Sequence, residues 1–303
     1  MTENKENLKN RMDKFHDSYY KQLLLIPLII LVFCLVYMFF FYSSNGDFIH
    51  RDITLTGGTS VTVYEQTNIE NLELSISGKL EGVIIREISD LVTGQQKAVT
   101  VETTSDMDTA QAVLEEYFGH ALTEENSSFE FTGSALSRNF FKQLLIAVIL
   151  ALVFMAIVVF LIFRTFIPSA AIVLSAITDI FMTLTVLNIF GVRISTAAIV
   201  AFLMLIGYSV DTDILLTNRV LKRHEGSLNN KIYSAFKTGI TMTLTSLVAV
   251  VLALIIISPI SHVLSTIFVI LVIGLSFDIL NTWITNVSIL KWYVLKKEGK
   301  NEN

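Results

Sequence analysis

Six long apolar stretches divide this chain, and one polar stretch separates the first of them from the second. Each apolar stretch is about as long as the roughly 20 residues that an α-helix needs to cross the hydrocarbon core of a bilayer. The pattern predicts a polytopic α-helical membrane protein with one helix before the polar stretch and a five-helix transmembrane block, 138–292, after it. The expected transmembrane helices are 22–42, 140–163, 168–190, 196–218, 238–258 and 263–290.

The polar stretch 43–137 has the composition of a soluble domain and contains short runs with strand-like alternation. Ser105 and Asp106 are candidate caps for the second of its two expected helices. The order β-α-β-β-α-β predicts one α+β domain of the ferredoxin-like type between the first two transmembrane helices. The strands are expected at 59–65, 82–91, 97–103 and 128–131, and the helices at 68–80 and 105–119.

Composition supports a membrane protein and excludes several other classes. Of the 303 residues, 52% are hydrophobic and 16% are charged, so a lipid bilayer must cover the excess of apolar side chains. The net charge of −5 argues against nucleic acid as a partner. With no nucleotide-binding loop, no paired nucleophile and base, and no cluster of metal ligands, we expect neither an enzyme nor a cofactor or metal.

Basic residues outside the apolar stretches predict the orientation in the membrane. Placing the N-terminal segment 1–21 and the tail 293–303 in the cytoplasm puts most lysines and arginines on that side, as the positive-inside rule requires. We therefore expect a multi-pass plasma-membrane protein with both termini cytoplasmic and the domain 43–137 extracytoplasmic. The loop residues expected on the cytoplasmic side are Arg164, Arg219, Lys222, Arg223 and Lys231, and those at the outer ends are Arg138 and Arg193.

Ionisable residues inside the apolar stretches are the candidate functional groups. A charge near the bilayer centre costs about 2.5–3.5 kcal/mol, so several in one bundle require an explanation. Helical spacing of i, i+3 and i+4 groups them with other polar residues into stripes that should face one another or water. The stripes are Ser175, Asp179 and Thr183; Lys237, Thr241 and Thr245; and Asp278, Asn281, Thr282 and Thr285.

The fourth stretch holds two acids, Asp211 and Asp213, that point about 200° apart around a helix. Asp213 shares its face with Ser209 and Thr217. Asp211 shares its face with a different set of residues, which are Gly207, Tyr208 and Asn218. Spacing thus favours Asp213 as the acid on a continuous polar stripe. Two uses remain open for these acids, a proton relay or purely structural pairing.

Several segments of the chain resemble the SecF family, particularly its archaeal branch. The resemblance extends over essentially the whole chain after residue 20, and the fourth-stretch motif is the most specific part. The segments are Ile206–Arg219, Leu55–Ser60 with its Thr-Gly-Gly-Thr element, Lys237–Thr245, and Asn281–Asn286 followed by Leu290–Trp292.

The resemblance implies an accessory subunit of the Sec translocase that is paired with SecD, forms half of an RND-type bundle and helps unfolded preproteins to leave a SecYE-type channel. It also implies a proton-conducting Asp at position 211 with a basic residue, Lys237, beside it. Bacterial members carry Arg there, and unlike Arg, Lys can titrate. The resemblance favours Asp211 as the proton carrier, whereas spacing favours Asp213. The alternatives are an RND-type exporter of small solutes or lipids, and a structural scaffold for the channel.

The pair Gly57 and Gly58 lies at the start of the polar domain, within the family motif. Adjacent glycines are typical of a tight turn or bulge that requires positive φ. Direct contact with a substrate polypeptide is the alternative, and turn geometry is the interpretation we prefer.

Overall fold

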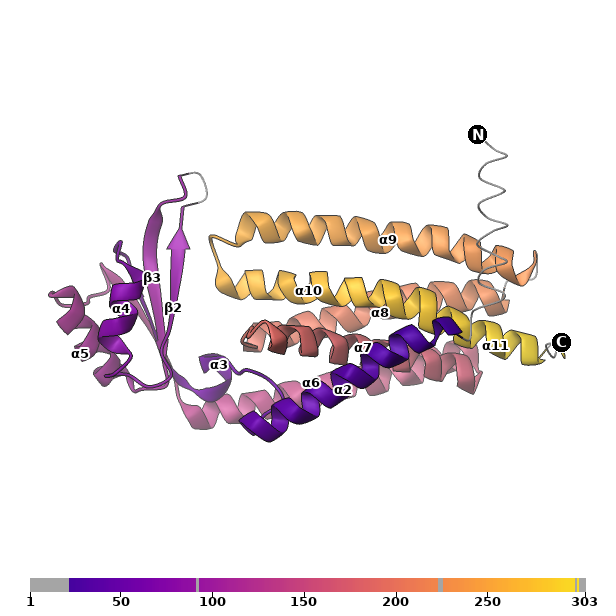
Figure 1. The fold of residues 1–303 in the computed structure, drawn as a ribbon, viewed down its shortest axis with the longest axis horizontal. Coiled ribbons are helices and arrows are strands. Elements are labelled where there is room, and N and C mark those ends of the chain that lie inside the picture. The colour runs from indigo at the N-terminus through magenta and orange to yellow at the C-terminus, as the bar shows by residue number, and fades with distance from the viewer. Residues whose placement is uncertain (1–21, 91–92, 223–225, 298, 300–303) are drawn as a thin grey trace.

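The computed structural model describes residues 22–90, 93–222, 226–297 and 299, and Figure 1 shows an α+β domain at one end of a helical bundle. The predicted cytoplasmic segment 1–21, Arg223 and part of the predicted tail lie outside the described residues. The bundle consists of α2 (Leu25–Asn45), α6 (Ser134–Phe163), α7 (Phe166–Ile189), α8 (Thr196–Lys222), α9 (Leu228–Ile257) and α10 (His262–Leu280), which continues through the π-helix η1 (Asn281–Asn286) into α11 (Val287–Lys297).

Six helical spans in the described part of the chain are long and apolar enough to cross a membrane. The last of them, His262–Lys297, combines α10, η1 and α11. Helices α6 and α9 begin earlier than their apolar stretches, because polar turns that begin at Ser134 and Leu228 extend the same helices beyond the hydrocarbon-compatible part. The predicted class, a polytopic membrane protein with six transmembrane helices, is confirmed.

Helices α7, α8 and α10 form the centre of the bundle, while α6 and α9 leave most of their surface exposed. Large apolar side chains from the three central helices make one buried cluster that includes Leu187, Phe202 and Leu271. Gly274 on α10 lets α8 approach closely, because a Cβ there would lie 2.5 Å from Cδ2 of Leu205. Helices α8 and α10 are therefore closely packed against each other at this point.

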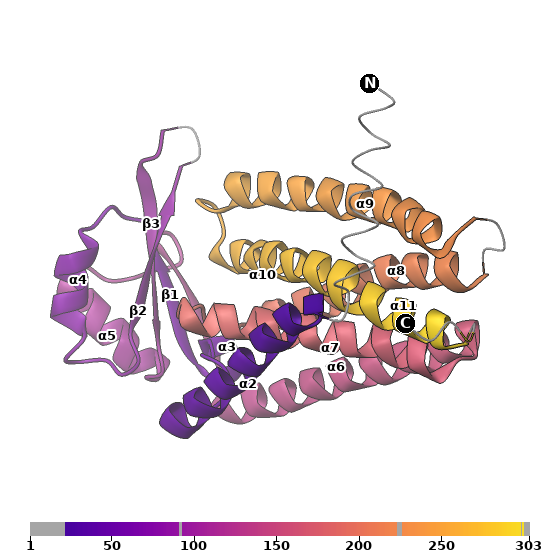
Figure 2. The same ribbon diagram turned by 45° about the vertical axis from the view of Figure 1, so that its right-hand side comes forward.

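The α+β domain contains one antiparallel sheet with the strand order β2-β3-β1-β4. Val61 in the central strand is paired with Val101 on one side and Phe129 on the other, and all three side chains face the helices. Figure 2 shows α4 and α5 on the side of the sheet that faces away from the bundle. The predicted ferredoxin-like arrangement is confirmed. Its elements are β1 (Gly58–Val63), α4 (Ile69–Ile76), β2 (Ile84–Ser89), β3 (Gln96–Thr103), α5 (Met107–Phe118) and β4 (Ser127–Thr132).

Side-chain caps decide where the two helices of the domain begin. Asn68 accepts a hydrogen bond from the backbone N–H of Asn71 at 3.1 Å, and α4 starts directly after it. Asp106 caps α5 in the same way through the N–H of Thr109, at 2.7 Å. Of the two candidate caps in the sequence, Asp106 thus makes the cap, whereas Ser105 accepts a hydrogen bond from the N–H of Glu81.

A short helix that the sequence did not predict, α3 (Ile53–Thr56), connects the bundle to the first strand. It is followed by Gly57 and Gly58, whose φ angles are 87° and 149°, as the turn interpretation of this pair requires. A Cβ on Gly57 would lie 2.4 Å from Cα of Ser134, and one on Gly58 would lie 2.3 Å from the carbonyl oxygen of Thr103. The glycines thus allow the chain to turn into the sheet alongside the start of α6.

Candidate functional site in the helical bundle

Three aspartates from three helices are fully buried in the bundle: Asp179 on α7, Asp213 on α8 and Asp278 on α10. Asp179 accepts hydrogen bonds from Ser209 Oγ at 2.7 Å and from Asn281 Nδ2 at 2.6 Å. Its two carboxylate oxygens therefore tie α7 to α8 and to η1. We call Asp179, Asp213 and Asp278 the buried acid cluster.

Asp213 and Asp278 share one hydroxyl. Thr282 lies 2.8 Å from Asp213 Oδ1 and 3.2 Å from Asp278 Oδ1, and Asn286 donates a second hydrogen bond to Asp213 at 2.7 Å. Other members of the stripes predicted for the third and sixth spans are also buried, and these are Ser175, Thr183, Asn281 and Thr282. Two of the three predicted polar stripes thus meet inside the bundle.

Among the described residues, the carboxyl groups of the buried acid cluster have no cation to pair with and too few hydrogen-bond donors for all of their oxygen atoms. None of the ion pairs within the described residues includes Asp179, Asp213 or Asp278. Asp213 Oδ2 and Asp278 Oδ2 are buried without a hydrogen-bond partner in the described part of the chain, and so is Asn286 Oδ1. Three ionised carboxylates buried this way without a cation would be costly, so the environment favours protonated forms of these groups.

The remaining predicted site residues on α8 lie on the other side of the helix. Asp211 is exposed on the surface of this chain, as are Gly207 and Tyr208, whereas Ser209 and Asp213 are buried. Asp211 makes no ion pair within the described residues. The structure thus separates Asp211 from the buried acid cluster.

The third predicted stripe, on α9, is exposed along its whole length. Lys237, Thr241 and Thr245 all face outward, and the hydroxyl of Thr241 donates only to the backbone carbonyl of Lys237, at 2.7 Å. Lys237 therefore does not contact the buried acid cluster, and of the two options expected for this stripe, contact with the other stripes or with water, the first does not hold within this chain. The reason is that α9 packs against α8 and α10 through a different face, which includes Ala235, Gly239 and Thr243.

Asn286 is a site residue that sequence reasoning missed. It lies four residues after Thr282 and eight after Asp278, so it continues the polar face of this helix, and it ends a π-helix, whose hydrogen bonds run from residue i to i+5. The segment η1 begins at Asn281 and ends at Asn286, and each asparagine donates to a different aspartate. The sequence signal that was available is the pair of amides at the two ends of this polar segment.

The chain is thus a polytopic membrane protein with a six-helix bundle, a buried acid cluster inside that bundle, and one ferredoxin-like domain inserted after the first helix. The family described as "Protein export membrane protein SecD/SecF, C-terminal" matches residues 111–296. Curated relatives match over nearly the whole chain and are named protein-export membrane protein SecF. The chain therefore belongs to the SecF family of protein-export membrane proteins.

Two relatives illustrate the match. The SecF of Methanocaldococcus jannaschii is 38% identical over 288 residues, which covers 93% of this chain and 98% of the relative. The SecF of Methanothermobacter thermautotrophicus is 38% identical over 280 residues, which covers 91% of this chain and 93% of the relative.

Solved structures share the fold. The crystal structure of SecDF, a translocon-associated membrane protein from Thermus thermophilus, superposes with a TM-score of 0.71 at 17% identity and covers 91% of this chain. A second SecDF structure, in a super-membrane-facing form, superposes with a TM-score of 0.58 at 18% identity. This chain spans 38% and 39% of those two chains.

Proposed function

We propose that this protein is an accessory subunit of the Sec translocase that works with a SecD-type partner and uses the proton gradient to promote the export of unfolded preproteins through a SecYE-type channel. The observation that carries the proton coupling is the buried acid cluster, with three carboxyl groups on three helices and no ion pair to a cation among the residues that the structure describes. In this proposal the α+β domain lies outside the cell membrane and both termini lie in the cytoplasm.

A change in the proton occupancy of the cluster would change how the helices pack. Asp179 joins α7 to α8 and η1, and Asp213 joins α8 to η1, so each carboxyl is a cross-link between helices. A proton adds an O–H donor to a carboxyl group that otherwise only accepts, so these links must rearrange when the proton is bound or released. One charge that crosses 100 mV supplies about 2.3 kcal/mol, which is enough to bias a two-state packing.

The exposed polar residues of α8 and α9 support a partner of the SecD type. In an isolated chain Asp211 would be exposed within its predicted span and Lys237 at the end of its span, and membrane proteins avoid the cost of such groups by burying them in a bundle. A second half-bundle placed against this face would cover both. We propose that Asp211 acts in proton passage at that interface, and that the buried acid cluster lies behind it.

The test is export of a reporter preprotein into membrane vesicles with an imposed proton gradient. Asp213→Asn and Asp211→Asn are compared with the wild type at equal expression and equal association with SecD. We expect both variants to lose the gradient-dependent part of export. Normal export by both variants would overturn proton coupling and favour the scaffold alternative.

An exporter of small solutes or lipids is the second candidate, and no feature of the described residues favours it. Its test uses the same vesicles. Gradient-driven movement of a lipophilic dye that stops in Asp213→Asn, with preprotein export unchanged, would support it instead.

A further inference from the structure

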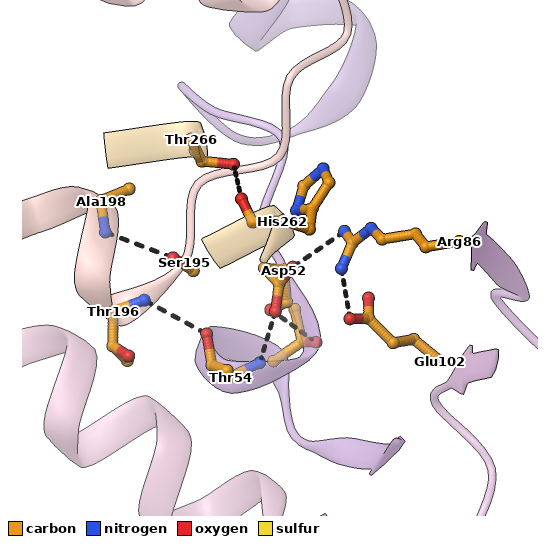
Figure 3. Close-up of polar contacts among 10 residues, drawn as sticks. Asp52, Thr54, Arg86, Glu102, Ser195, Thr196, Ala198, His262 and Thr266 are labelled. Atoms are coloured by element: carbon orange, nitrogen blue, oxygen red, sulfur yellow. Dashed lines mark hydrogen bonds and ion pairs between the residues drawn. The ribbon is translucent and has the colours of Figure 1, made fainter. Parts of the chain in front are cut away.

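An arginine joins the α+β domain to the bundle. Arg86 on β2 donates from Nη2 to Asp52 Oδ2 at 3.2 Å and from Nη1 to Glu102 Oε1 (Figure 3). Arg86 and Glu102 belong to the sheet, whereas Asp52 caps α3, whose Leu55 is part of the apolar core of the bundle. The guanidinium therefore spans the boundary between domain and bundle, and we call Asp52, Arg86 and Glu102 the junction.

Asp52 and α3 are attached in turn to the start of α8. The backbone N–H of Asp52 donates to the carbonyl of Ile194 at 3.1 Å, and the N–H of Thr196 donates to Thr54 Oγ1 at 3.2 Å (Figure 3). Helix α8 begins at Thr196 and carries Asp213. The junction thus lies at one end of a continuous series of contacts that leads from the sheet to the helix of the buried acid cluster.

A cavity of about 270 Å³ lies beside the junction, between the open face of the sheet and the α9–α10 turn. Glu102 lines this cavity, is 7% exposed, and has a buried oxygen, Oε2, with no hydrogen-bond partner in the described part of the chain. A second link between domain and bundle lies here, because the N–H of Ser89 donates to the carbonyl of Pro259 at 3.2 Å. A buried carboxylate oxygen without a donor is costly, and a proton on it removes the charge.

Charged and titratable residues from several elements surround Glu102. Arg86 from β2 and Arg193 from the α7–α8 connection are cations, whereas Asp52 and Glu130 are anions. His262 at the start of α10 also lines the cavity, together with Glu87. Burial, reinforced by Asp52, raises the pKa of Glu102 to about 7 against the opposing effect of Arg86.

We propose that Glu102 is a proton-binding site that controls how firmly the α+β domain is docked on the bundle. When Glu102 is protonated, Arg86 neutralises Asp52 alone and the junction has no net charge. When Glu102 is ionised, the junction holds two carboxylates against one guanidinium, and separation of the domain lets water reach the extra charge. This site lies outside the membrane spans and is independent of the proposed proton relay in the bundle.

The docked state binds the proton more tightly than a separated state in which Glu102 is hydrated and has its ordinary pKa of 4.5. Docking is therefore strongest at low pH and weakens as the pH rises through about 7. Linkage between a pKa of about 7 and one of 4.5 predicts that the docking equilibrium falls about 30-fold between roughly pH 5.5 and roughly pH 8.5.

The test is hydrogen exchange of the full chain in lipid nanodiscs, with protection factors corrected for the intrinsic effect of pH on amide exchange. The readout is the N–H of Ser89, which donates across the boundary to Pro259. In the wild type we expect its protection to fall about 30-fold over that pH range, while the central sheet amides Val61 and Val101 stay protected. In Glu102→Gln, a permanent mimic of the protonated side chain, protection at Ser89 should stay high at every pH.

Glu130→Gln is the matched control, because Glu130 lines the same cavity from β4 but is exposed. It should keep most of the wild-type pH dependence, because Glu130 raises the pKa of Glu102 less than burial and Asp52 do. A wild-type Ser89 amide whose protection does not change with pH would overturn the proposal, even if the Glu102 variant does not fold. Unchanged pH dependence in a folded Glu102→Gln would overturn it as well. Neither readout involves export, so failure here is distinguishable from failure of the proposed function.

Discussion

Asp211 and Asp213 are two residues apart on α8 and lie in opposite environments. Asp213 is fully buried and accepts hydrogen bonds from Thr282 and Asn286, whereas Asp211 is exposed on the surface of the chain. A substitution at Asp213 therefore tests the internal packing of this chain, and a substitution at Asp211 tests its outer face.

Removing the hydroxyl of Ser209 should destabilise the bundle. Ser209→Ala leaves Asp179 Oδ2 buried without its donor, and an unsatisfied buried polar group costs about 1–3 kcal/mol. The measurement is the free energy of unfolding in detergent micelles. Thr241→Ala is the control, since that hydroxyl is exposed and bonds only within its own helix, and it should change the stability by less than about 0.5 kcal/mol. Equal effects of the two variants would argue against a tightly bonded Asp179.

The contact between the π-helix and α8 should appear as energetic coupling. Asn286→Ala and Asp213→Ala each remove one partner of the same hydrogen bond of 2.7 Å, so the double variant should lose less stability than the sum of the two. We expect a coupling energy of about 0.5–3 kcal/mol from a double-mutant cycle of unfolding free energies. Strictly additive effects would mean that the two side chains do not interact in the membrane.

Gly207 should matter for assembly and not for the stability of the isolated chain. A Cβ on this residue would meet no atom within 4 Å, so Gly207→Ala should leave the unfolding free energy unchanged or slightly raised. If the exposed face of α8 packs against SecD, the added methyl group should weaken that association, because small residues allow close helix packing in membranes. The measurement is co-purification with SecD.

Gly239→Ala should show the opposite behaviour and serves as the comparison for Gly207→Ala. A Cβ at Gly239 would lie 2.4 Å from Cζ2 of Trp283 inside the bundle, so overpacking should cost about 1–3 kcal/mol of stability in the isolated chain. Unimpaired SecD association of Gly207→Ala would mean that the partner lies elsewhere.

Gly57→Ala should impair the α+β domain more than Gly46→Ala does. Both glycines have positive φ, at 87° and 70°, and an alanine in such a conformation costs about 1–2 kcal/mol. Only at Gly57 would the new Cβ also lie 2.4 Å from backbone, at Ser134. Hydrogen exchange of β1 and β3 measures the difference, and similar exchange in the two variants would contradict the close approach seen here.

Local pattern was enough to predict the spans and the ferredoxin-like domain, because both depend on hydrophobic periodicity and on caps such as Asn68 and Asp106. The same periodicity placed Asp213 on a polar stripe. It could not reveal α3, which is only four residues long, or the π-helix η1. The pairing of Asp52 with Arg86 was also beyond reach, since it joins residues 34 apart through tertiary packing.

The exposure of Asp211 and Lys237 affects how stable a copy of this chain is before it assembles with a partner. If the proposed SecD-type partner covers these faces, an unpartnered copy leaves Asp211 on a face that meets lipid, at a cost of about 2.5–3.5 kcal/mol for a charged group near the bilayer centre. The folded chain would then be more stable in the membrane with its partner than alone.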